Sequence, residues 1–134
     1  MKRFFVFFIL TLCCLLPCAN LSDHAVRPMV ASVEIYTRHD ETASSYTCWE
    51  DQTVRQILNY LRGARTHRVT TSLPPYEGQD LYLIRVRMTD GSNQIYQQIG
   101  NDFLRKNGSA WMCINPRHGK KLKILEKQVL SSHF

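Results

Sequence analysis

The fold is decided by residues 81–99, which read LYLIRVRMTDGSNQIYQQI. The first part has the two-residue period of a half-buried β-strand, and one face of that strand holds Tyr82, Ile84, Val86 and Met88. Asp90-Gly91 follows, a pair that adopts the positive φ of a tight turn at little cost. Residues 94–99 then lead back, so we expect an antiparallel hairpin here.

A second hairpin follows along the chain. Residues 103–105 and 110–114 flank Asn107-Gly108, a turn that lies 17 residues after the first one. Turn signals at such short spacing are typical of an antiparallel meander. Residues 31–37 alternate in the same way and residues 66–71 are consistent with a short strand. We therefore expect a sheet of four to five strands.

Two amphipathic helices complete the predicted fold. Residues 38–47 have turn and loop chemistry, and Thr47 and Glu50 have the spacing of a capping box. The helix predicted after them spans 48–62, and its apolar stripe at i, i+3, i+4 and i+7 consists of Val54, Ile57, Leu58 and Leu61. A second helix over 120–130 has the stripe Leu122, Leu125 and Val129. The predicted class is α+β: an antiparallel meander sheet with both helices packed on one face.

The N-terminal region predicts export. Residues 1–19 have the order of a secretory signal peptide, with a basic start, 13 mostly apolar residues and a turn-prone exit. Such a run is too short to span a bilayer comfortably. We expect a flexible lead-in at 20–30, a single domain at 31–134, and a location outside the cell or on the outer face of the cytoplasmic membrane. Removing the signal lowers the formal net charge from +6 to +4, because Lys2 and Arg3 leave with it.

Two cysteines of the predicted mature chain and one at the signal exit suggest possible chemistry. Cys48 and Cys113 are separated by 64 residues and could form one disulfide, which in the chain-entropy model is worth roughly 4 kcal/mol. The alternative is two separate buried thiols, because free cysteine packs as a small hydrophobic residue. Cys18 is a candidate for lipidation, although Pro17 stands where a lipoprotein signal has a small residue. Ordinary cleavage nearby and an uncleaved signal that anchors the chain are the alternatives.

Basic residues form the clearest charge pattern. They are Arg85 and Arg87 on one strand, with Arg117, Lys120, Lys121, Lys123 and Lys127 on or beside the last helix. The functional interpretation is a patch for anionic lipid, a wall polymer or an acidic envelope protein. The alternative is an ordinary solvated face. A net charge of +4 is too small to indicate nucleic acid, and we expect none as a partner.

No catalytic, cofactor or metal site is predicted. The histidines are dispersed, without the close ligand pair that usually marks a zinc site. Glu77, Arg85, Arg87 and His118 supply the residue types of a small secreted ribonuclease-like hydrolase, but they form no local motif. A non-enzymatic domain is therefore the first interpretation.

Several segments together resemble small exported domains of Gram-positive bacteria. The resemblance rests on Val33-Glu34-Ile35-Tyr36, Leu58-Asn59-Tyr60-Leu61, Tyr82-Leu83-Ile84-Arg85-Val86, Asp90-Gly91, Tyr96, Asp102-Phe103-Leu104 and Trp111. It covers about 80 residues and implies an extracytoplasmic α+β domain, without an activity or site residues. Pro17 before Cys18 departs from the lipoprotein members of that group.

These observations favour a small binding or regulatory domain that uses its sheet face or the loop at 72–79 to contact a partner. The loop contains Pro74-Pro75-Tyr76, and the two prolines exclude regular structure there. An inhibitor or immunity-type protein for another exported protein is the alternative. A ribonuclease-like hydrolase is the third possibility.

Overall fold

A computed structural model describes residues 29–70 and 72–132. The predicted signal peptide at 1–19, with Cys18, and most of the predicted lead-in lie outside the described residues.

The described chain forms one antiparallel sheet of seven strands. Their bounds are β1 Val30–His39, β2 Thr42–Cys48, β3 Thr66–Thr70, β4 Leu81–Met88, β5 Asn93–Ile99, β6 Phe103–Lys106 and β7 Trp111–Ile114. The strand order is β2-β1-β4-β5-β6-β7-β3. The expected α+β class with an antiparallel sheet is confirmed, but four to five strands understates the sheet.

Strand β2 covers most of residues 38–47, for which the sequence predicts turn and loop structure. Its sequence, TASSYTC, lacks apolar alternation, so it gives no strand signal of its own. It is a strand because it pairs with β1 in continuous register, from His39↔Thr42 to Val33↔Cys48. Asp40, with φ of 54°, provides the turn between them.

The predicted meander is present from β4 to β7. Gly91 and Gly108 have φ of 86° and 70° in the two turns where the sequence predicts them, and β4 pairs with β5 from Leu81↔Ile99 to Arg87↔Asn93. The whole sheet is not a simple meander, however. β1 pairs with β4, and β3 crosses to the far edge beside β7.

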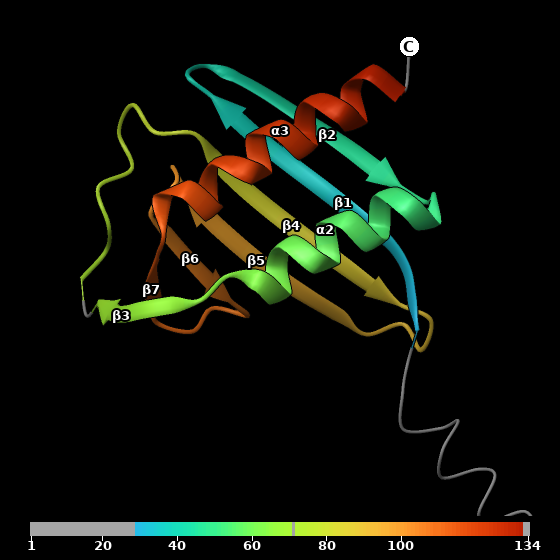
Figure 1. Cartoon of the computed structure of the whole chain (residues 1–134), viewed down its shortest axis with the longest axis horizontal. Coiled ribbons are helices and arrows are strands. Elements are labelled where there is room, and N and C mark those ends of the chain that lie inside the picture. Colours follow the sequence, from blue (N-terminus) through green and yellow to red (C-terminus); the bar gives the residue numbers. More distant parts are fainter. Residues whose placement is uncertain (1–28, 71, 133–134) are drawn as a thin grey trace, which may run out of the picture.

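Both helices lie on the same side of the sheet (Figure 1). Helix α2 spans Asp51–Gly63 and its N-cap is Glu50, which makes no side-chain capping bond. The predicted capping box is therefore wrong, because Thr47 belongs to β2. Helix α3 spans Pro116–Ser132 and begins four residues earlier than expected. The Asn115 side chain caps it, since Oδ1 accepts a hydrogen bond of 3.0 Å from the Arg117 amide.

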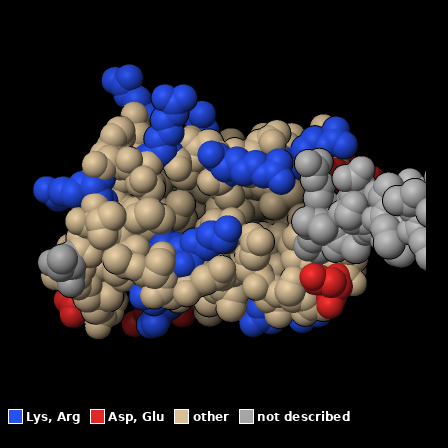
Figure 2. Space-filling view, turned by 90° about the horizontal axis from the view of Figure 1, so that it is seen from below, with Lys and Arg blue, Asp and Glu red and all other residues tan. Residues whose placement is uncertain are grey.

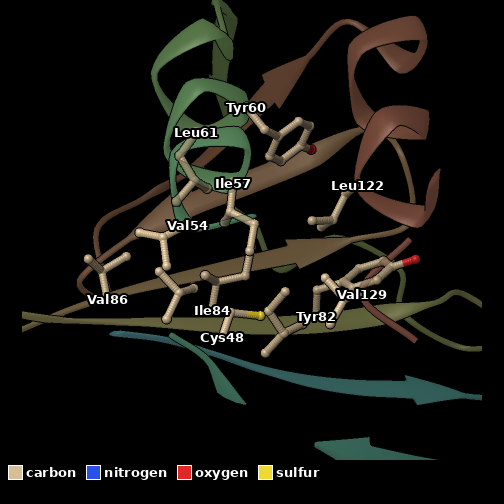
Figure 3. Packing of buried hydrophobic residues seen from close by; sticks show 12 residues of the cluster. Cys48, Val54, Ile57, Tyr60, Leu61, Tyr82, Ile84, Val86, Leu122 and Val129 are labelled. Carbon is tan, nitrogen blue, oxygen red and sulfur yellow. The ribbon is translucent and has the colours of Figure 1, made fainter. Parts of the chain in front are cut away.

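The hydrophobic core fills the space between the sheet and the helices (Figure 3). It consists of Val33, Ile35, Cys48, Val54, Ile57, Tyr60, Leu61, Tyr82, Ile84, Val86, Leu122 and Val129. Each fully buried aliphatic side chain contributes about 1.5–3 kcal/mol. The predicted apolar stripes of both helices supply part of this core, with Leu58 and Leu125 packed at its border.

Candidate binding site

The side of the sheet away from the helices has its own set of side chains. Successive residues of a strand point to opposite faces, so the neighbours of the core residues in β1 and β4 point away from α2 and α3. Tyr36 pairs with Leu83, Leu83 with Gln97, and Gln97 with Arg105. This row crosses β1, β4, β5 and β6 on what we call the helix-free face.

A cleft of about 460 Å³ opens on the helix-free face. The segment between β3 and β4 provides one wall through Leu73 and Tyr76, and the sheet provides the floor. The strand residues that line the cleft are Tyr36, Thr37, Arg38, Ala43, Leu81, Tyr82, Leu83, Gln97, Gln98, Ile99 and Trp111. The loop that the sequence indicates as a contact element therefore borders the cleft, with Tyr76 half exposed.

Two large apolar side chains are buried in this region although the main core excludes them. Trp111 is 7% exposed and Ile99 is 6% exposed, and neither belongs to the cluster beneath the helices. Pro74 of the β3–β4 segment is also buried. The cleft thus has a rigid apolar floor, held by a segment whose two consecutive prolines limit its backbone freedom.

Guanidinium groups lie on the same face of the sheet as the apolar floor. The Arg105 guanidinium lies over the Trp111 ring, 4.4 Å from its centroid, and its Nε donates a hydrogen bond to the Gln97 side chain. Arg85 Nη1 and Arg87 Nε lie 3.3 and 3.0 Å from the two carboxylate oxygens of Glu34. Two cations therefore share one carboxylate on this face.

Two hydrogen-bond donors on the helix-free face have no acceptor. Arg85 Nε and Trp111 Nε1 are buried and make no hydrogen bond within the described part of the chain. A buried donor without a partner costs about 1–3 kcal/mol. Both atoms are closed to solvent, so an external acceptor could reach either one only if the covering side chains moved.

The structure divides the predicted basic patch. Arg85 and Arg87 lie on the helix-free face, whereas Arg117 and the four lysines lie on α3, on the opposite side of the sheet. Lys123 is also partly neutralised, with Nζ 3.2 Å from Asp80. Figure 2 shows lysine and arginine side chains at separate positions over one side of the molecule. The residues therefore do not form one continuous patch.

The possible disulfide between Cys48 and Cys113 is absent from the structure. Cys48 and Cys113 are both free thiols, and β1, β4, β5 and β6 lie between their strands β2 and β7. Strands are about 4.8 Å apart, so this separation far exceeds the roughly 7 Å limit between bridged Cα atoms. The alternative interpretation is two separate buried thiols. The structure has two separate thiols, of which Cys48 is buried and Cys113 is half buried.

The residues of a ribonuclease-like site are not brought together. His118 lies on α3, where its Nε2 donates a hydrogen bond of 2.8 Å to the Tyr60 carbonyl and its ring stacks on Tyr60. Arg85 and Arg87 lie on the other side of the sheet, and Glu77 lies in the β3–β4 segment. No common substrate position connects these side chains.

Sequence reasoning missed a cluster around His39, at the end of β1. His39 Nδ1 lies 2.7 Å from Asp80 Oδ1, and Nε2 lies 2.9 Å from both oxygens of Glu126. Burial lowers the pKa of His39, but the hydrogen bonds and negative charges of Glu126 and Asp80 outweigh it and raise this pKa. Both ring nitrogens are occupied, so the ring has no free nitrogen with which to act on a substrate. The three residues are 41 and 46 positions apart in sequence, which leaves no local spacing to detect.

Two further findings concern only the described residues. No group of three or more His, Cys, Asp or Glu side chains within 29–70 and 72–132 is arranged to hold a metal ion. No helix in the same part of the chain is long and apolar enough to cross a membrane.

The comparisons with known proteins give no relative. No protein-family model, curated protein or solved structure matches this chain. The resemblance to small exported domains of Gram-positive bacteria stays a prediction.

Proposed function

We propose that this protein is a small extracytoplasmic, non-enzymatic binding domain and that the cleft on the helix-free face is its binding site. The observation that carries the proposal is the cleft itself, an apolar hollow of about 460 Å³ on a sheet face that neither helix covers. Concave, mostly apolar sites of a few hundred cubic ångströms with a small number of polar groups are typical of ligand pockets.

The side chains around the cleft suit recognition. Tyr36 and Tyr76 are exposed at its border, and Trp111 is fixed beneath Arg105. Tyrosine, tryptophan and arginine are the residue types that most often dominate binding energy. The two aromatic side chains bury much area with few rotatable bonds, and the planar guanidinium of arginine donates several hydrogen bonds.

A fragment screen followed by protein NMR tests this proposal. We expect small aromatic fragments to shift the signals of Leu83, Ile99 and the Trp111 indole N–H. The substitution Ala43→Trp, which fills the cleft from an exposed position on β2, should abolish these shifts. Gln52→Trp, an exposed position on α2, is the matched control and should leave them unchanged.

Fragment binding at a different place would contradict the proposed site. Fragments that bind the groove between α2 and α3, lined by Gln56, Tyr60 and Ile124, and leave the Trp111 signal in place would move the binding site to the opposite side of the molecule.

A further inference from the structure

We propose that the ligand of the cleft is an acidic polypeptide segment. An apolar side chain of that segment enters the cleft, and aspartate or glutamate side chains on either side of it pair with arginines at its border. The inference rests on the proposed function, since it names the ligand class for the same site.

The charge of the helix-free face favours an anionic partner. Among the strand residues that the structure describes, those with side chains on this face include the arginines Arg38, Arg68, Arg85, Arg87 and Arg105 and the single carboxylate Glu34. Glu34 already serves both Arg85 and Arg87. Carboxylates supplied by a ligand would complement this excess, and charge-assisted hydrogen bonds from guanidinium to carboxylate are among the strong ones.

Arg38 is the most available of these cations. It lines the cleft and is exposed, and its side chain makes no hydrogen bond or ion pair with another described residue. Arg105 lies at the other side of the floor, over Trp111. A ligand that spans the floor therefore meets one guanidinium on each side.

The helix-free face is richer in hydrogen-bond donors than in acceptors, which favours a ligand that accepts hydrogen bonds. Arg85 Nε and Trp111 Nε1 both donate and neither has an acceptor. An ionised carboxylate only accepts hydrogen bonds and offers about four lone-pair sites. Arg85 Nε and Trp111 Nε1 are closed to solvent, whereas the exposed Arg38 guanidinium lines the cleft and can donate directly to ligand oxygens. A basic ligand would bring further donors to this face.

The apolar floor distinguishes a polypeptide from other anions. Leu81, Leu83 and Ile99 lie between the arginines, and a phosphate polymer has no apolar side chain to place there. An anionic bilayer presents a broad surface, whereas the apolar lining here lies within a hollow. A polypeptide supplies both the apolar anchor and the flanking carboxylates.

The sheet geometry also gives the spacing of the carboxylates. Arg38 lies on β1 and Arg105 on β6, with β4 and β5 between them. The two positions are also offset by two residues along the strands, because Arg38 is in register with Phe103. Three strand spacings and this offset together amount to about 16 Å, which an extended chain covers in about four to five residues. The expected pattern is an acidic residue, an apolar residue two positions later and a second acidic residue two positions after that.

The test begins with random dodecapeptides displayed on phage and selected on the immobilised full-length chain. We expect enriched sequences to contain acidic residues four positions apart around an apolar one. The selected peptide is then synthesised together with a version in which lysine replaces each acidic residue. Fluorescence polarisation measures the affinity of both peptides. The lysine version should bind at least about tenfold more weakly, because each ion pair that is lost lowers the affinity several-fold.

Matched variants locate the contacts. Arg38→Gln and Arg105→Gln should each weaken binding of the acidic peptide by about fivefold, as expected for a partly exposed ion pair. Arg55→Gln, at an exposed position of α2, should not change it. Circular dichroism of each variant checks that the fold is retained. Replacement of Arg38 should leave the core intact, because its side chain is exposed and has no ion-pair partner among the described residues.

Each contrary outcome has a separate meaning. Enrichment of neutral or basic peptides, no enrichment, or unchanged affinity in both cleft variants would overturn the ligand class. Displacement of the acidic peptide by inorganic polyphosphate or by vesicles of phosphatidylglycerol and phosphatidylcholine at lower concentration than free peptide would also overturn it. If the fragment shifts at Trp111 persist, only the ligand class has failed; if they too are absent, the proposed function fails with it.

Discussion

At the scale of single residues, His39 contacts two carboxylates at once. A neutral imidazole carries one N–H, so it can donate to only one carboxylate. Contact with Asp80 and Glu126 together is therefore a property of the protonated ring. Glu126 is 4% exposed, and loss of the proton from His39 weakens the bonds that balance its buried charge.

This contact predicts a pH dependence of stability. The folded-state pKa of His39 is raised above its ordinary value of 6.5, so its contribution is complete below that value and is lost as the pH rises through the raised pKa. Burial raises the pKa of Asp80, but hydrogen bonds from His39 and Lys123 outweigh it and lower this pKa below 3.8. The contribution of Asp80 is complete above that value and is lost as the pH falls through the lowered pKa.

Urea unfolding of the wild type and His39→Gln from pH 4 to pH 9 measures this effect. We expect the substitution to cost about 1–3 kcal/mol between pH 5 and pH 6, because hydrogen bonds to charged groups are lost, and less at pH 9. His67→Gln, at an exposed position of β3, is the control. A cost for His39→Gln that is constant from pH 5 to pH 9 would contradict the account.

A second residue-scale prediction concerns Gly119, where α3 touches the turn after β5. A Cβ atom at this position would lie 2.1 Å from the Asn101 carbonyl oxygen, so the helix would have to move. We expect Gly119→Ala to lower the free energy of unfolding by about 3 kcal/mol or more. Gly63→Ala is the matched control, because its Cβ meets only the His118 ring at 3.2 Å, and it should cost much less. Equal costs in urea unfolding would argue against this helix position.

At the scale of elements, turn residues and apolar periodicity predict the hairpins and helices whose formation depends on contacts within a few residues. The hairpins around Gly91 and Gly108 and the stripe Val54–Leu61 appear as expected, because turn chemistry and apolar periodicity act over a few residues. β2 could not be predicted in this way, since its seven residues form a strand only through pairing with β1. The start of α3 was missed although Asn115-Pro116 is a strong N-terminal signal.

The candidate site was predictable only in part, and for the same reason. The loop with Pro74-Pro75-Tyr76 and the sheet face were both expected as contact surfaces, and they border one cleft. That Arg38, Arg105 and Trp111 lie around this cleft depends on the strand order, which places β1 beside β4 and β3 beside β7. Sequence periodicity contains no information about that order.

At the scale of the whole molecule, the sheet separates groups that sequence reasoning placed together. Arg85 and Arg87 are on the opposite side from the α3 lysines, and Cys48 is far along the sheet from Cys113. The described domain is therefore held together by its core and backbone pairing, without a bridge between these cysteines.

Thiol labelling tests this arrangement. Burial raises the pKa of Cys48, and Cys113 is only half buried, so iodoacetamide should modify Cys113 first in the native protein. Cys48 should react at a comparable rate only after unfolding in urea. Peptide mass mapping under non-reducing conditions distinguishes the sites, and a linked Cys48–Cys113 peptide would contradict the fold.

The binding cleft and its acidic ligand are tested together by one NMR titration. The selected acidic peptide is added to the ¹⁵N-labelled full-length chain, and the indole N–H of Trp111, which lacks an acceptor in the free protein, is followed. We predict that this signal shifts, because Trp111 lines the cleft that the peptide occupies. The shift should be lost in Ala43→Trp and retained in Gln52→Trp. An unmoved Trp111 signal, with shifts confined to the groove between α2 and α3, would contradict the account.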